Sequence, residues 1–121
     1  MTEAPRPYPR RGEIWPVQLP NQPADFHTPR PAVVVSLDVR NRLAGDVIVV
    51  PLSTNLRPLA THVLLTAGDG GLRYDSMAKC EQVTTLDKRL LGDGPLGGFV
   101  PADELEAVVR GIRRAIGEVL A

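Results

Sequence analysis

An arginine at the start of an apolar segment is the first residue suited to chemistry. Arg30 stands directly before Pro31 and the apolar run that begins at Ala32. Because proline fixes the backbone at this point, the guanidinium group would be held at a rigid strand end. A group held in that way suits a phosphate or a developing oxyanion. Arginines at strand ends are also common on ordinary surfaces, so Arg30 alone does not establish a site.

A lysine and a carboxylate two residues apart form a second candidate. Residues 76–85 have an extended pattern, in which alternate side chains share a face. One face would carry Met77, Lys79, Glu81 and Val83. The opposite face would carry Ala78, Cys80, Gln82 and Thr84. Lys79 and Glu81 could act as an acid/base or phosphate-clamping pair, with an ordinary solvated salt pair as the alternative. Ser53 and Thr54, which end an apolar run, are either hydroxyls of a site or simple turn formers.

No metal site and no phosphate-binding loop is expected. Cys80, His27 and His62 lie far apart without the spacing of metal ligands. The glycine-rich segments at 68–71 and 92–98 do not lead from a strand into a helix with a Lys-Ser/Thr pair, so plain turns are expected there.

The composition favours one small domain in a reducing compartment. A chain of 121 residues fits a single domain, and its one cysteine cannot form an internal disulfide. Residues 1–11 do not resemble a signal peptide, and no run approaches the roughly 20 apolar residues that span a bilayer. We therefore expect a cytoplasmic protein without a membrane contact. The net charge of zero argues against a non-specific nucleic-acid coat protein, although clustered arginines could still bind phosphates.

Short β-branched runs predict the strands that would position these residues. The expected strands are residues 12–19, 32–37, 47–52, 61–65 and 76–85, with a further short strand at 98–100 as an option. Pro16 indicates an edge strand or a bulge. Residues 38–46 are expected to form a turn, and the long polar loop at 20–29 is of a length that often carries function. Residues 1–10 are expected to be a flexible tail.

A helix is predicted over residues 102–119. Apolar residues recur there at three- and four-residue spacing, from Leu105 to Leu120, with Arg110, Arg113 and Arg114 on the other face. The sequence therefore predicts a mainly β fold with a C-terminal helix.

Five stretches taken in order resemble one protein family. They are Arg11-Gly12-Glu13-Ile14-Trp15, Arg30 to Val35 with Asn41-Arg42, Val49-Val50-Pro51-Leu52-Ser53-Thr54, Asp75-Ser76, and Cys80-Glu81-Gln82 with Thr85-Leu86-Asp87-Lys88. In that order they are similar to the MazF/PemK/Kid toxins over about residues 10–120. The resemblance implies a domain at 11–121 with a small SH3-like barrel of the PemK/CcdB type, which pairs as a homodimer.

The resemblance also implies a function and roles for individual residues. It implies the toxin of a type II toxin–antitoxin system, a cytoplasmic endoribonuclease that causes growth arrest, needs no cofactor, and is blocked by a MazE/PemI-like antitoxin. Its substrate would be single-stranded RNA, cut by attack of the 2′-OH to leave a 2′,3′-cyclic phosphate. The implied catalytic residues are Arg30, Ser53, Thr54 and Glu81, and the implied substrate contacts are Lys79, Gln82 and Arg42. His27, in the loop at 20–29, is a further candidate for substrate binding or acid/base transfer, with a passive loop residue as the alternative. Either His27 or Glu81 could be the base.

Several positions depart from the family pattern. The loop at 20–29 lacks the usual glycines and Glu-Gln pair, Ser53 replaces a threonine, and Thr84 stands where an arginine is common. A gyrase-binding toxin of the CcdB type and a catalytically silent SH3-like binding module therefore remain as alternatives. The first is disfavoured because the chain does not end in Trp-Gly-Ile.

Overall fold

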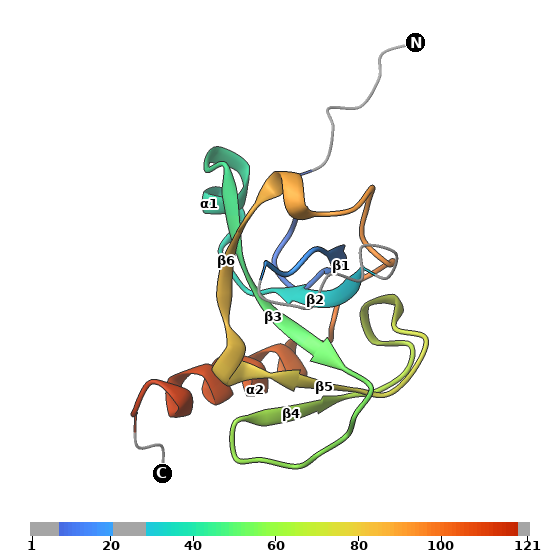
Figure 1. The fold of residues 1–121 in the computed structure, drawn as a ribbon, viewed down its shortest axis with the longest axis vertical. Coiled ribbons are helices and arrows are strands. Elements are labelled where there is room, and N and C mark those ends of the chain that lie inside the picture. The colour runs from blue at the N-terminus through green and yellow to red at the C-terminus, as the bar shows by residue number, and fades with distance from the viewer. Residues whose placement is uncertain (1–7, 21–28, 119–121) are drawn as a thin grey trace.

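Six short strands form an antiparallel sheet with a helix packed against it in the computed structural model (Figure 1). The structure describes residues 8–20 and 29–118. The strands are β1 (Ile14–Val17), β2 (Arg30–Val34), β3 (Asp46–Ser53), β4 (His62–Leu65), β5 (Ser76–Lys79) and β6 (Thr84–Asp87). Two α-helices, α1 (Asp38–Leu43) and α2 (Ala102–Ala115), accompany them, together with the 3₁₀ turns η1 (Asp69–Gly71), η2 (Cys80–Gln82) and η3 (Lys88–Leu90).

Strand β3 is the centre of the sheet because it pairs with three other strands. The order is β1-β2-β3-β5-β4, and β6 also pairs with β3. Leu52 faces Ala78 in the β3–β5 ladder, whereas Val49 faces Thr84 in the β3–β6 ladder. The two pairs are three residues apart on β3 but six residues apart on the chain that carries β5 and β6. The three extra residues equal the length of η2, which therefore cannot pair with β3 and forms a turn outside the ladder.

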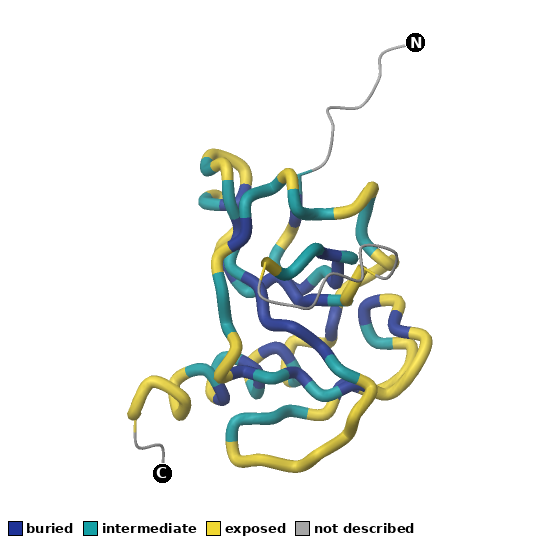
Figure 2. The backbone as a smooth tube through the Cα atoms, viewed as in Figure 1, coloured by how far each residue is buried: buried dark blue, intermediate teal, exposed yellow. Residues whose placement is uncertain are grey.

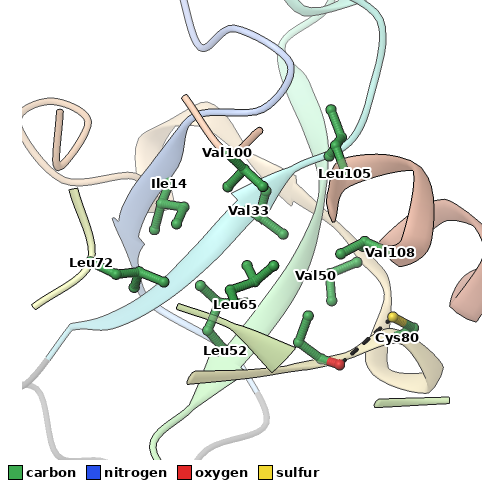
Figure 3. Packing of buried hydrophobic residues seen from close by; sticks show 11 residues of the cluster. Ile14, Val33, Val50, Leu52, Leu65, Leu72, Cys80, Val100, Leu105 and Val108 are labelled. Carbon is green, nitrogen blue, oxygen red and sulfur yellow. Dashed lines mark hydrogen bonds between the residues drawn. The ribbon is translucent and has the colours of Figure 1, made fainter. Parts of the chain in front are cut away.

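The central strands are buried on both faces, which explains their nearly continuous apolar sequences. One face packs in a cluster that includes Ile14, Val33 and Val50, and is covered by Leu105 and Val108 of α2 (Figure 3). The other face packs around Trp15 and the alternate residues of β2 and β3. In Figure 2 most of β3 is accordingly drawn as buried, while the segment after it is exposed. Trp15 is a core residue of this second cluster.

The mainly β fold with a C-terminal helix is confirmed, with an open sheet in place of a closed barrel. The sheet is open, because β6 ends at Asp87 and η3 follows it. Among the described residues, a single isolated bridge between Val17 and Leu91 joins this segment back to β1. β1 is an edge strand, as Pro16 predicted, and no helix within residues 8–20 and 29–118 is long and apolar enough to cross a membrane.

Helix α2 ends four residues earlier than predicted. Gly117 has a φ of +98° and its N–H donates to the Arg114 carbonyl, while the Glu118 N–H donates to Arg113. This is the Schellman arrangement, in which a left-handed glycine stops the helix. Ile116, predicted to lie on the buried face, is consequently 75% exposed.

Three other local predictions are also corrected. Residues 38–46 contain α1 rather than a turn alone, because the buried Asn41 side chain donates to the Ser36 carbonyl at 2.9 Å and holds one helical turn inward. Residues 76–85 are two strands separated by η2. Residues 98–100 form no strand, since Val100 makes one backbone bond, to Gly12. Most of the expected flexible tail, residues 1–7, lies outside the described residues.

Candidate functional site

A pocket of about 220 Å³ opens where the chain leaves the β5 ladder and forms η2. The segment that follows β3 provides one wall, and β4, β5 and η2 provide the other. The lining residues are Asn55, Arg57, Leu59, His62, Lys79, Glu81 and Gln82. Three of the predicted site residues, Lys79, Glu81 and Gln82, therefore share one pocket.

Glu81 is the centre of the hydrogen bonds in this pocket. Its Oε1 accepts from the Thr61 hydroxyl at 2.7 Å, and its Oε2 lies 3.1 Å from His62 Nε2. The backbone N–H of Cys80 also donates to the Thr61 carbonyl at 3.1 Å. The start of β4 is thus joined to η2 by side-chain and main-chain bonds.

These contacts keep Glu81 ionised. Partial burial raises the pKa of its carboxyl group, but the hydrogen bonds from Thr61, its own backbone and His62 outweigh burial and leave the pKa below its usual value. A carboxylate with a lowered pKa is a weaker proton acceptor, yet it keeps its negative charge into acidic solution.

His62 connects the two walls of the pocket. Its Nδ1 lies 2.8 Å from the backbone carbonyl of Arg57, and its ring is only 4% exposed. In the β4–β5 ladder it pairs with Lys79, so the two side chains belong to the same face of the sheet.

Cys80 supports η2 from the core side. Its side chain is fully buried, and burial, followed by the nearby charge of Glu81, raises the pKa of the thiol to about 12. The thiol is therefore protonated near neutral pH and is not a nucleophile. Gly111 of α2 lies directly against it, since an added Cβ atom would be 2.6 Å from the sulfur.

Arg30 and Ser53 belong to the neighbouring part of the same surface. The β2–β3 ladder pairs Ala32 with Pro51, and the same register extended by two residues sets Arg30 across from Ser53. Ser53 also faces Met77 on β5, which is two residues from Lys79 and so about 7 Å from it along the strand. The Ser53 hydroxyl accepts from the Asn55 N–H at 3.1 Å, and Thr54 is exposed beside it.

One predicted residue, Arg42, is not brought to this surface. Arg42 lies on α1, next to the start of β3, whereas Ser53 ends that strand about 23 Å away. His27 lies outside the described residues. Within the described residues, no group of three or more His, Cys, Asp or Glu side chains could hold a metal ion, and the expected lack of a cofactor stays a prediction.

Sequence reasoning missed Thr61, His62, Asn55 and Arg57. A signal was present for His62, because alternation in the strand at 61–65 places Val63 and Leu65 in the core and His62 on the opposite face. The contact with Glu81 could not be found in this way, since it depends on the pairing of β4 with β5 and on the turn η2.

Comparison with known proteins identifies the family. The family model for the PemK-like, MazF-like toxins of type II toxin–antitoxin systems matches residues 10–116. The chain belongs to this family. All of the pocket and both members of the Arg30–Ser53 pair fall inside the matched range.

Individual members of the PemK/MazF family agree with this assignment. The chain is 41% identical over 102 residues to the endoribonuclease MazF9 of Mycobacterium tuberculosis, covering 78% of this chain and 85% of that protein. It is 31% identical over 87 residues to the endoribonuclease EndoA of Bacillus subtilis, covering 69% and 75%. A solved endoribonuclease in complex with its cognate antitoxin, from a mycobacterial species, superposes with a TM-score of 0.76 at 27% identity and covers 93% of this chain and 99% of that one.

Proposed function

We propose that this member of the PemK/MazF family is a toxin that cuts single-stranded RNA at specific sequences without a metal ion. The observation that carries the proposal is family membership over residues 10–116 together with the similarity to two endoribonucleases. The pocket formed by Lys79, Glu81 and Gln82, next to the Arg30–Ser53 pair, supports it, since both kinds of charge needed for RNA cleavage lie on one surface.

The proposed reaction is attack of a ribose 2′-OH on the adjacent phosphorus atom. The new O–P bond forms as the bond to the 5′-oxygen breaks, which leaves a 2′,3′-cyclic phosphate and a 5′-hydroxyl end. A base takes the proton of the 2′-OH, a cation stabilises the charge on the phosphorane, and an acid returns a proton to the 5′-oxygen. We assign the cationic role to Arg30, with the Ser53 and Thr54 hydroxyls as hydrogen-bond donors to the phosphate oxygens.

Glu81 and His27 are the two candidates for the base. The lowered pKa of Glu81 and its bonds to Thr61 and His62 support a role in charge and positioning more than proton transfer. We assign Lys79 and Gln82 to RNA contacts from their place in the pocket. An RNA contact by Arg42 stays a prediction. It would require the RNA to extend from the pocket to α1, along the length of β3.

We also propose a cytoplasmic protein that pairs as a homodimer and is neutralised by a MazE/PemI-like antitoxin. The similar mycobacterial endoribonuclease was solved with its cognate antitoxin, which supports a partner of that kind.

Arg30→Ala tests the proposal on a long single-stranded RNA in the presence of EDTA, with the fragment ends sequenced. We expect discrete cuts ending in cyclic phosphate by the wild-type protein and a loss of at least about a hundredfold in rate for the variant. Arg110→Ala, an exposed arginine on α2, is the matched control and should cut at the wild-type rate. Equal cutting by Arg30→Ala and the wild type would reject the assignment.

The two alternatives give different results in the same experiments. A catalytically silent RNA-binding module would bind the RNA and leave it intact. A gyrase-binding toxin would leave RNA intact and arrest growth with trapped gyrase–DNA complexes, whereas an RNA-cutting toxin arrests growth with cleaved RNA.

A further inference from the structure

We propose that His62 is a positioning residue of the RNA site. Its ring fastens the segment 54–60 to β4 and η2, and so holds Asn55 and Arg57 over the pocket. This inference rests on the proposed function, because the segment forms one wall of the surface that is assigned to RNA.

The segment 54–60 has few other attachments. All of its residues are exposed, and it has no regular secondary structure (Figure 2). Two short-range bonds define its ends: Asn55 N–H to Ser53 Oγ at 3.1 Å, and His62 N–H to the Leu59 carbonyl at 3.0 Å. Between them, the only hydrogen bond found among the described residues joins the Arg57 carbonyl to His62 Nδ1 at 2.8 Å. The ring is therefore the anchor for the middle of the segment.

The geometry of the ring suits this role better than proton transfer. A carbonyl oxygen can only accept, so the bond to the Arg57 carbonyl places a hydrogen on Nδ1, and Nε2 lies 3.1 Å from Glu81 Oε2. The basic residues Lys79 and Arg57 also line the pocket, together with the Glu81 carboxylate. With both nitrogens bonded and the ring 4% exposed, His62 has no free atom to offer a substrate.

Loss of the ring should therefore weaken RNA binding more than the chemical step. Without the anchor, Asn55 and Arg57 sample many positions and must be ordered again when RNA binds. We expect KM to rise about tenfold, the equivalent of about one hydrogen bond, with kcat changed by less than about threefold.

His62→Phe and Thr61→Val form a matched pair of variants. The first keeps a ring but removes the bonds to Arg57 and Glu81, and the second removes only the other bond to Glu81. Amide hydrogen exchange at the two bonded ends of the segment, residues 55 and 62, should be about tenfold faster in His62→Phe and unchanged in Thr61→Val. If His62 acted only through Glu81, both variants would show the same rise in KM and neither would loosen the segment, which would overturn the proposal.

Two further measurements test the role of His62 even if the His62→Phe protein does not fold. His62→Gln keeps a donor that can reach only one of the two acceptors, so its exchange should fall between the wild type and full loss. In the wild-type protein, the ring ¹⁵N signals should show a hydrogen on Nδ1, and a bare Nδ1 would refute the anchor. Both readouts are independent of catalysis, so a protein that cuts no RNA would reject the proposed function while the anchor could still be confirmed.

Discussion

Replacing Gly111 with alanine tests how tightly α2 is packed beneath the candidate site. The added Cβ atom would lie 2.6 Å from the Cys80 sulfur, 3.0 Å from its Cβ and 3.4 Å from the Thr61 carbonyl. Cys80 is fully buried, and its thiol points toward the Ala78 carbonyl at 3.7 Å (Figure 3). Since the Cys80 Cβ is itself only 3.0 Å away, rotation of the thiol cannot relieve the whole contact, so either α2 or η2 must shift.

The size of the effect follows from two opposing terms. Overpacking of this kind costs about 1–3 kcal/mol, whereas alanine stabilises a helix interior by about 1 kcal/mol relative to glycine. We therefore expect a net loss of about 1 kcal/mol in the free energy of unfolding. For a domain of this size, that loss lowers Tm by about 4 °C.

Thermal and urea unfolding followed by circular dichroism would measure this loss. Gly45→Ala is the matched control, because nothing lies within 4 Å of its added Cβ, and it should leave Tm unchanged or slightly higher. Combined with Cys80→Ala, which removes the sulfur, Gly111→Ala should cost at least about 0.5 kcal/mol less than the sum of the two single changes. A Gly111→Ala protein as stable as the wild type, or strictly additive costs, would refute the close packing.

Two buried polar groups give further predictions. Burial first, and then Asp69, raises the pKa of Glu104 to about 7, and its buried Oε2 has no hydrogen-bond partner among the described residues unless the carboxyl is protonated. The folded state thus holds this proton more tightly than the unfolded chain, so the added stability is full below about pH 4.5 and is lost as the pH rises through about 7. The start of α2 favours the carboxylate and the side chain is partly solvated, so only part of this effect is expected. Glu104→Gln should remove about 1–2 kcal/mol of the decline in unfolding free energy between pH 5 and 8, measured by urea unfolding. Glu106→Gln, at an exposed position, should leave the decline unchanged, and equal pH profiles for the two variants would contradict the burial of Glu104. Asn41→Ala removes the donor to the buried Ser36 carbonyl and leaves the Ser36 hydroxyl with its contacts to Ile48 alone. It should therefore cost about 2–3 kcal/mol in urea unfolding, and a loss below about 1 kcal/mol would contradict the importance of this contact.

The apolar pattern was sufficient for the elements of the core. Residues 47–52 could be read as a buried strand because β-branched residues occupy positions 47–50 and the segment is apolar throughout. The spacing of Leu105 and Val108 likewise predicted the helix that covers one face. The helix end was missed because the apolar spacing continues past Gly117, although a glycine at that position is itself a stop signal.

The break at Cys80–Gln82 could not be predicted in the same way. Residues 76–85 look extended throughout, and the 3₁₀ turn arises only because β5 and β6 both pair with the same edge of β3 at different registers. This constraint comes from residues far apart in the sequence, so the local strand and turn propensities of residues 76–85 do not contain it. Arg30 and Ser53 were linked only by the family resemblance, and the antiparallel pairing of β2 with β3 places them at one end of the sheet.

The three residues of η2 face two different environments, since Cys80 lies in the core and Glu81 and Gln82 line the pocket. In a continuous strand, Glu81 and Lys79 would share a face and Cys80 and Gln82 would share the other, so Gln82 would point into the core with the thiol. The 3₁₀ turn instead keeps Cys80 buried against Gly111 and exposes both Glu81 and Gln82 to the pocket. A change under the turn should therefore be felt above it, because the backbone that fixes the thiol also fixes the carboxylate that holds Thr61 and His62. For this reason Gly111→Ala, although remote from any RNA contact, should also loosen the pocket and reduce RNA cleavage, whereas Gly45→Ala should leave it unchanged.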